Sequence, residues 1–236
     1  MDPAFIGIVC GLKSEAQAIG PIADIGAIRI AVSGAHAERA RERARALVRD
    51  GARALVSFGV SGGLSATVQP GELLVGTEIV RVPEGHTWCL SQDLLSALST
   101  CAAAAGFTLA EARLAGSDVL IDNVAVKRQL ASDYAVHAVD MESHAVAEVA
   151  AEAGLRCAAI RAVADPWDRA MPPSVAGAVA EDGSIRTLSV LRTAAGRPKD
   201  WLDLVRLGRE NKAAHDALGR CARHVFPTLL RVMHIG

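Results

Sequence analysis

Short apolar runs that fit buried strands alternate along this chain with segments whose apolar residues have helical spacing. One run, 157–164 (CAAIRAVA), contains a single charge, and the segment 142–153 before it has alanines and valines along one helical side. Strands that are apolar throughout are buried on both faces, and their alternation with helices is typical of a mostly parallel sheet. The strands predicted in this way are 5–11, 28–32, 53–60, 72–80, 107–115 and 157–164, and a further element begins at 136–139. The sequence therefore predicts an α/β fold with three α/β/α layers around a central mixed, mostly parallel sheet.

The predicted fold extends over the chain as one domain, residues 1–236. Hydrophobic residues make up 51% of the sequence, which is enough for a sizeable core, and no Gly/Ser-rich linker or charge block divides it. The alternation stops between 167 and 183, where two consecutive prolines favour a loop with a partial helix. Beyond it, 185–195 and 201–230 are predicted to be terminal helices.

Charge and cysteine content exclude several classes of partner and cofactor. The formal net charge is −1, so nothing predicts binding to a nucleic acid. The 5 scattered cysteines form no C-x-x-C pair and no zinc spacing, which favours reduced thiols in a cytoplasmic protein without a metal or cofactor. The sequence has no signal peptide and no run of about 18 uncharged apolar residues, so no transmembrane segment is expected.

Polar residues follow four of the predicted strands at the point where each strand ends. They are Glu15, the Gly-rich turn Ser61-Gly62-Gly63, the pair Met141-Glu142, and Asp165. Ligands of an open α/β sheet bind outside the carboxyl ends of its strands. A carboxylate at one such end is often only a helix cap. Four polar positions along one edge predict a shared binding site.

Asp165 is the strongest candidate for acid catalysis. It follows the run 156–164, whose only internal charge is Arg161. A carboxyl group at the end of a buried strand is poorly solvated, which raises its pKa and allows it to donate a proton near neutral pH. The alternative is that Asp165 only begins a turn before Pro166.

The Gly-rich turn admits two interpretations. A sharp turn at Ser61-Gly62-Gly63 would expose backbone N–H groups to an anion or to a closely approaching ligand. The string Gly59-Val60-Ser61-Gly62-Gly63 also matches a G-x-S-x-G nucleophile elbow, but a loop rather than a helix is predicted after it, so a serine hydrolase is a minor alternative. His36 and His144 begin predicted helices near the same edge, and their contact with a ligand stays open.

These segments resemble, in order, those of the nucleoside phosphorylase/nucleosidase superfamily that includes methylthioadenosine/S-adenosylhomocysteine nucleosidase. The resemblance covers most of the chain from Gly7 to Asp165. Its last two motifs, with 23 residues from Glu142 to Asp165, are the most specific. The matching segments are Gly7-Ile8-Val9 to Glu15, 58–64 (FGVSGGL) with 70–75 (PGELLV), 139–143 (VDMES) and 160–165 (IRAVAD).

The resemblance implies a role for each residue at the predicted edge. Asp165 would protonate or hydrogen-bond purine N7, and Glu15 would hold and activate a water. Glycosidic cleavage passes through an oxocarbenium-like state, which carboxyl groups beside the sugar and the base stabilise without a metal or cofactor. Glu142 would bind ribose hydroxyls and Met141 would pack under the sugar. The implied substrate-binding set is Ser61, Gly62, Leu120, Met141 and Glu142.

The first turn favours hydrolysis over phosphorolysis. A phosphorylase needs cations to hold phosphate, typically an arginine in this turn. Here the turn is Gly11-Leu12-Lys13-Ser14-Glu15, and the carboxylate of Glu15 suits a water better than an anion. Lys13 and the Gly-rich turn keep a phosphorolytic purine nucleoside phosphorylase as an alternative.

Several departures from the methylthioadenosine nucleosidases point to another substrate. Ala164 stands where the family has serine, and Leu120 stands where an aromatic residue usually stacks on the base. The segment 164–169 (ADPWDR), the Pro172-Pro173 pair and Leu207-Gly208-Arg209 resemble the hopanoid-associated branch. By resemblance, that branch removes adenine from adenosylhopane, a lipid-linked adenosine in hopanoid biosynthesis. Its tail would leave past apolar residues, here Ala170, Met171, Val175, Ala176, Val179, Phe226, Leu229, Leu230, Val232 and Met233, unless these are core or dimer contacts.

The expected partner is therefore a small nucleoside, lipid-linked in the adenosylhopane interpretation. By resemblance the chain forms a homodimer in the cytoplasm, and a lipid-linked substrate would bring it to the inner membrane surface. Two alternatives stay open beside phosphorolysis. One is a methylthioadenosine/S-adenosylhomocysteine nucleosidase, and the other is a nucleoside-binding regulatory protein without catalytic activity.

Overall fold

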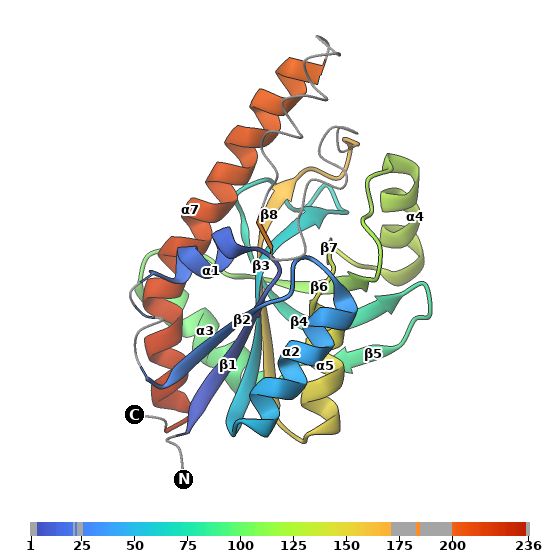
Figure 1. The fold of residues 1–236 in the computed structure, drawn as a ribbon. Helices are drawn as coiled ribbons and strands as arrows, with labels where there is room; N and C mark the ends of the chain where they lie inside the picture. The colour runs from blue at the N-terminus through green and yellow to red at the C-terminus, as the bar shows by residue number, and fades with distance from the viewer. Residues whose placement is uncertain (1–3, 21, 23–25, 171–182, 185–199, 235–236) are drawn as a thin grey trace.

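A computed structural model describes residues 4–20, 22, 26–170, 183–184 and 200–234. A mixed sheet lies at the centre with helices on both sides (Figure 1). The strands are β1 (Phe5–Cys10), β2 (Ile28–Val32), β3 (Ala52–Gly63), β4 (Leu73–Val82), β5 (Thr87–Cys89), β6 (Ala110–Ser117), β7 (Ala138–Asp140) and β8 (Arg156–Asp165). The helices are α1 (Lys13–Ile19), α2 (Ala37–Arg49), α3 (Gln92–Ala104), α4 (Val124–Tyr134), α5 (Ser143–Glu152) and α7 (Asp200–Val232). The predicted α/β fold with a mixed sheet between helices is confirmed.

The sheet has an open part and a closed part. Strands β2, β1, β3 and β8 are parallel neighbours. Strand β8 also pairs antiparallel with β4, β4 pairs with β6, β6 with β7, and β7 returns antiparallel to β3. Strands β3, β8, β4, β6 and β7 therefore close into a ring. This ring was not predicted from the sequence, because strand patterns do not identify which distant strands pair.

Two apolar cores lie on the two faces of the sheet. In β1, Ile6, Ile8 and Cys10 face one core, and Phe5 and Val9 face the other, as the two-residue period of a strand requires. Helices α1, α3 and α7 supply residues to the first core, whereas α2 and α5 supply residues to the second (Figure 1). Each large apolar side chain that is fully buried in this way contributes about 1.5–3 kcal/mol to folding.

The Gly-rich segment was expected to be a sharp turn, and this expectation is wrong. Strand β3 continues through Ser61 and Gly62 to Gly63, pairing with β8 on one side and β7 on the other. A register shift between Ser61 and Gly62 absorbs the change in geometry. The serine-hydrolase interpretation fails with the turn, because a nucleophile elbow needs its serine between a strand and a helix.

Several element boundaries and one whole helix differ from the prediction. Strand β4 extends to Val82 instead of residue 80, and strand β6 begins at Ala110 instead of residue 107. Helix α4 was not predicted at all, although the side chain of Asn123 caps it by accepting hydrogen bonds from two backbone N–H groups, at 2.8 and 3.3 Å. The predicted helix 201–230 is confirmed as α7, and the predicted helix 185–195 lies outside the described residues.

The residues proposed to line an apolar exit divide into two groups. Those from 171 to 179 lie outside the described part of the chain. Four of the C-terminal set belong instead to the core between α7 and the sheet, because they lie on the inner side of this long amphipathic helix or in the turn that follows it. They are Phe226, Leu229, Leu230 and Met233.

Candidate active site

Glu15 lies in the first turn of α1 and ties this helix to strand β3. Its carboxylate accepts hydrogen bonds from the backbone N–H groups of Leu12 (Oε2, 2.8 Å) and Val60 (Oε1, 2.8 Å). The side chain is buried, and burial raises the pKa of Glu15 above its usual range. The two backbone N–H groups and the charge of Arg161 oppose that rise. Glu15 is thus a fixed carboxyl group with the raised basicity of a general base.

Asp165 ends strand β8, as predicted, and it is buried rather than exposed in a turn. Burial raises the pKa of Asp165, and the ammonium group of Lys127 opposes the rise. Lys127, on helix α4, donates a hydrogen bond to Asp165 Oδ2. Neither this lysine nor its helix was predicted from the sequence.

Glu142 follows strand β7 at the start of helix α5. Burial raises the pKa of Glu142 to about 8; the charge of Arg161 opposes this rise, and those of Asp140 and Glu15 add to it. Met141, next to it, is only partly buried. A carboxyl group with this pKa is largely protonated at neutral pH, so it can donate as well as accept a hydrogen bond with a sugar hydroxyl.

Arg161 is the cation whose charge balances those of Asp140, Glu142 and Glu15. It is fully buried. Its Nη2 donates to Ser57 Oγ, to Asp140 Oδ1 (3.0 Å) and to Ser143 Oγ (2.8 Å), while Glu142 Oε2 lies 3.9 Å away. Within the described residues, its Nε and Nη1 atoms have no hydrogen-bond partner. A charged side chain inside an apolar strand requires a buried counterion. The sequence therefore indicates that Arg161 has an acidic partner, but it does not show which residue this is.

Asp140 fixes the chain that carries Glu142. Its Oδ1 atom accepts hydrogen bonds from the backbone N–H groups of Glu142 (2.8 Å) and Ser143 (2.7 Å), and its Oδ2 accepts from Ser143 Oγ (2.6 Å). Burial alone would raise the pKa of Asp140, but Arg161 and these bonds hold it below its usual range. Asp140 is therefore ionised and supports the start of α5.

Each of the three candidate carboxyl groups lies where a glycine leaves space for it. A methyl group on Gly59 or on Gly11 would lie closer to the facing carboxyl group than two atoms in contact can. The carboxyl group of Glu15 or Glu142 would then have to move. These glycines therefore let charged groups lie directly against the sheet. The distance from an ideal Cβ to the nearest carboxyl oxygen is 2.6 Å for Gly59 and Glu15, 2.7 Å for Gly11 and Glu142, and 3.2 Å for Gly62 and Asp165.

Glu15 and Asp165 lie at the same end of the sheet, over the last part of β3. Gly59, which lies under Glu15, pairs with Arg161 of β8, and Gly62 pairs with Asp165. Strands β3 and β8 are parallel here, so both carboxyl groups lie towards the carboxyl ends of these neighbouring strands. The spacing from Gly59 to Gly62 corresponds to about 10 Å along the strand. The predicted edge therefore brings these two residues into one region.

The remaining predicted positions differ in their surroundings. Ser61 is buried in β3, and its hydroxyl has no partner among the described residues. Leu120 is 41% exposed on the segment between β6 and α4, in contrast to the buried carboxyl groups. His36 is exposed, whereas His144 is fully buried with Nε2 2.9 Å from Asp118 Oδ1. Of these two histidines, only His144 lies in the interior.

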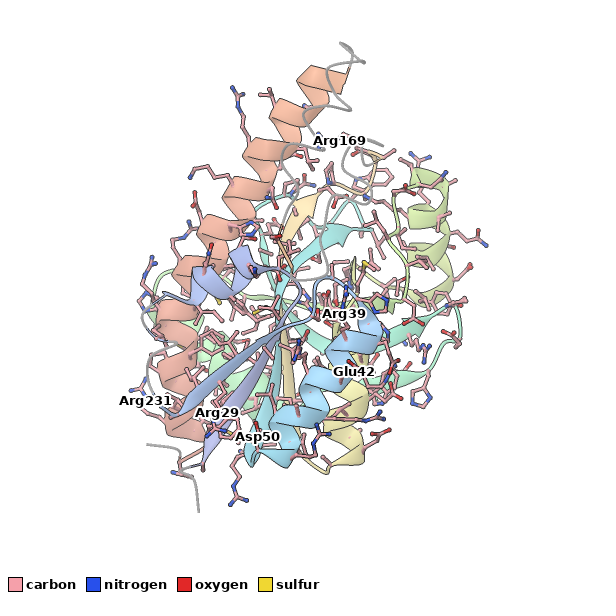
Figure 2. All side chains as sticks on the ribbon, in the orientation of Figure 1. Arg29, Arg39, Glu42, Asp50, Arg169 and Arg231 are labelled. Carbon is pink, nitrogen blue, oxygen red and sulfur yellow. The ribbon has the colours of Figure 1, made fainter. Side chains whose placement is uncertain are left out.

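An open groove of about 750 Å³ lies elsewhere, between helices α3 and α7. Its lining includes Cys101, Arg223 and Arg231 and contains none of the candidate carboxyl groups. Arg231 lies at the opposite end of the molecule from Arg169, which follows the carboxyl end of β8 (Figure 2). We therefore take the buried carboxyl cluster, and not this groove, as the candidate active site.

Two further observations bear on other functions. Across the residues that the structure describes, no group of three or more His, Cys, Asp or Glu side chains could hold a metal ion. Among the same residues, no helix is both long and apolar enough to cross a membrane.

Comparisons with known proteins give one family and many similar folds. The model of the family described as "Phosphorylase superfamily" matches residues 22–196, which include Glu142 and Asp165 but not Glu15. No curated protein matches the sequence.

Three solved structures represent the similar folds. Helicobacter pylori 5′-methylthioadenosine/S-adenosylhomocysteine nucleosidase, in a ligand complex, has a TM-score of 0.72 and 17% identity over 98% of this chain and 100% of that one. Helicobacter pylori futalosine hydrolase has a TM-score of 0.71 and 17% identity over 98% of both chains. A protein of Francisella philomiragia named as such a nucleosidase has a TM-score of 0.71 and 17% identity over 98% of this chain and 100% of that one. At this identity the likeness shows the fold alone.

Proposed function

Since the chain belongs to the phosphorylase superfamily, we propose that it cleaves the N-glycosidic bond of an adenosine-like nucleoside by hydrolysis and releases adenine. One observation supports this proposal most strongly. Glu15 of helix α1 and Asp165 of strand β8 are buried carboxyl groups with raised pKa values, and both lie against glycines near the carboxyl end of β3. The glycines beneath them, Gly59 and Gly62, lie three residues apart, which corresponds to about 10 Å along β3.

The two carboxyl groups have complementary roles in this reaction. Asp165 gives its proton to purine N7 while the bond between C1′ and N9 breaks, and the bonding electron pair leaves with the base. Glu15 takes a proton from a water whose oxygen then bonds to C1′. Solvent afterwards removes the proton from Glu15 and restores the one on Asp165. Each step uses a carboxyl group whose burial brings its pKa nearer to neutral pH.

Other residues of the cluster support the sugar and the water. Glu142, with a pKa of about 8, suits a ribose hydroxyl because it can donate or accept a hydrogen bond. Its negative form would also stabilise positive charge on the sugar ring. The Nε and Nη1 groups of Arg161, which have no partner among the described residues, are donors suited to a bound water.

The charges around Glu15 favour water over phosphate as the nucleophile. Buried acidic residues, Glu15, Asp140 and Glu142, surround the cation Arg161. Lys127, a second buried cation, is already paired with Asp165. Arg161 is likewise paired with Asp140, so neither of these buried cations is free to balance the charge of a phosphate dianion.

The finer proposal is that adenosylhopane is the substrate. It rests on the resemblance of residues 164–169 and 207–209 to the hopanoid-associated branch. Methylthioadenosine and S-adenosylhomocysteine are the competing substrates, because a nucleosidase of similar fold is named after them.

Adenine release distinguishes these substrates and the two reaction types. We expect the protein to release adenine from adenosylhopane in phosphate-free buffer, more efficiently than from methylthioadenosine or S-adenosylhomocysteine. The measurement is kcat/KM for each substrate with and without phosphate, with the sugar product identified by mass spectrometry. A strict need for phosphate would reject hydrolysis, and better turnover of methylthioadenosine would reject the lipid substrate.

Replacing Gly59 with alanine is expected to lower the rate of adenine release by about 100-fold. The new Cβ would overlap the carboxyl group of Glu15, and a catalytic group misplaced by about 1 Å can lose a factor of this size. Gly62→Ala is the graded comparison, because its Cβ would lie 3.2 Å from Asp165 Oδ1, where a small shift suffices. Kinetics and thermal unfolding of both variants test this order. A larger kinetic effect at Gly62 would contradict it.

A further inference from the structure

Lys127 is a lysine in the interior of the protein with every hydrogen of its ammonium group in use. Its side chain is 1% exposed. Besides its bond to Asp165 Oδ2, Nζ donates to the backbone carbonyls of Pro166 (3.0 Å) and Arg169 (3.2 Å). An ammonium group has three hydrogens, so these acceptors leave no donor for a substrate. Any effect of Lys127 on chemistry must therefore pass through Asp165.

The contact with Lys127 divides the two oxygens of Asp165 between different neighbours. Oδ2 faces the ammonium group, while Oδ1 is the oxygen nearer to the Cβ position of Gly62 on strand β3. The carboxyl group therefore has one oxygen held from helix α4 and the other directed over the glycine. This arrangement suits a proton donor, since one oxygen can carry the proton while the other fixes the direction in which it points.

The charged groups around Asp165 come from three elements. Lys127 lies on α4, Arg169 lies on the segment after β8, and Glu210 lies on α7. Arg169 Nη2 binds both carboxylate oxygens of Glu210, at 2.7 and 2.8 Å, so these two charges largely cancel each other. Lys127 is thus the charge with the strongest effect on Asp165.

A purely structural role is a poor explanation for a lysine at this place. Burying an ion pair costs desolvation free energy, and well-packed apolar residues of similar volume often give equal or greater stability. Helix α4 already packs through Leu130 on an apolar cluster that includes Val80, Val136 and Val139. The placement of the ammonium group at the candidate acid of the site is better explained by an effect on that acid.

We propose that Lys127 is a positioning residue for the proton donor: it orients Asp165 through one oxygen and stabilises the carboxylate that remains when the other oxygen gives up its proton. The inference rests on the proposed function. In the step concerned, the proton on Asp165 moves to purine N7 as the C1′–N9 bond breaks, and the negative charge left on Asp165 is paired with the ammonium group. Lys127 keeps its own proton throughout.

The test measures the titration of Asp165 directly. In protein labelled with ¹³C at aspartate carboxyl groups, the Asp165 resonance is identified by its absence in Asp165→Asn. We expect the pKa of Asp165 to rise by about one unit or more in Lys127→Met, because the cation that favours the carboxylate is gone. Lys127→Arg keeps the charge and should leave the titration close to that of wild type. Lys127→Gln, which is neutral but polar, replaces the methionine variant if the latter does not fold.

Kinetics with an adenosine-type substrate give the second readout. In Lys127→Met, kcat should fall by about 10- to 100-fold with little change in KM, and the alkaline limb of the pH profile should move to higher pH. Lys212, which is exposed and paired with Asp216, provides a matched control, and Lys212→Met should behave as wild type. An unmoved Asp165 titration in a folded, neutral variant would overturn the inference. If wild type releases no base at all, the proposed function fails while the NMR titration still decides whether Lys127 controls Asp165.

Discussion

Replacing Asp165 with asparagine is expected to lower kcat for adenine release by about 100-fold or more, with little change in KM. General acid catalysis contributes about 10²–10⁴ to a rate, and an amide keeps the shape of the carboxyl group but has no acidic proton. Burial raises the pKa of Asp165 in the wild-type protein. Wild-type activity should therefore decline as pH rises above that pKa, because the donor loses its proton. Asp165→Asn should lack this limb.

The variant has a second consequence that must be separated from the first. It leaves the buried ammonium group of Lys127 without its carboxylate, and an unpaired buried charge is destabilising. Thermal unfolding of Asp165→Asn shows whether the protein stays folded at the assay temperature. Asp168→Asn is the matched control, since that nearby side chain is more exposed and its variant should give wild-type rates. A folded Asp165→Asn protein with wild-type kcat would reject Asp165 as the acid.

The fold was predictable where a local pattern determines it. Apolar runs such as 157–164 identify strands that are buried on both faces, and the helical spacing of alanines and valines identifies α5. The ring of strands depends instead on contacts between segments far apart in the sequence. Helix α4 was missed for a related reason. Its buried residues are Lys127 and Leu130, so it has little apolar periodicity.

Only the acidic residues of the candidate site were predictable from the sequence. Glu15, Glu142 and Asp165 follow or end strands, and the rule that ligands bind at the carboxyl ends of strands selects them. The cations that balance them gave weaker signals. Arg161 stands out as the one charge inside a buried run, but the sequence does not show which groups surround it. The close approach of a carboxyl group to Gly59 is likewise a three-dimensional property, because Gly59 and Glu15 lie in separate elements.

Replacing Arg161 with methionine is expected to cause the largest loss of stability, about 3–5 kcal/mol at neutral pH. Breaking a buried ion pair by removing one partner leaves an uncompensated charge, and losses of this size are typical. Arg161 is fully buried and donates hydrogen bonds to Asp140 and to two serines, and Asp140 has no other ion-pair partner among the described residues. Methionine is flexible and fills much of the same space, so the loss would report charge more than packing.

The pH dependence of this loss has a definite sign. In wild type, burial acts to raise the pKa of Asp140, but Arg161 holds it below the usual value, so Asp140 contributes stability above its unfolded pKa. Without Arg161, we expect the carboxyl groups of Asp140, Glu15 and Glu142 all to have folded pKa values above their unfolded ones. Their contribution is then fully present below the unfolded pKa values and is lost as pH rises through the folded ones. The difference between wild type and Arg161→Met should therefore be larger at about pH 8 than at about pH 5, since carboxyl groups with raised pKa values ionise in this window.

Urea unfolding of both proteins at the two pH values measures this difference, provided that the slopes of the transitions agree. Arg156→Met is the matched control, because Arg156 begins the same strand, its side chain is 40% exposed and its pair with Asp93 lies at the surface. Exposed pairs contribute about 0–1 kcal/mol, so this variant should unfold nearly as wild type does. Equal losses in the two variants, or a loss at Arg161 that does not grow with pH, would show that Arg161 is not the counterion of the buried carboxyl cluster. The proposed reaction needs that counterion, since Glu15 and Glu142 can lie together against the sheet only while a cation beside them limits how far their pKa values rise.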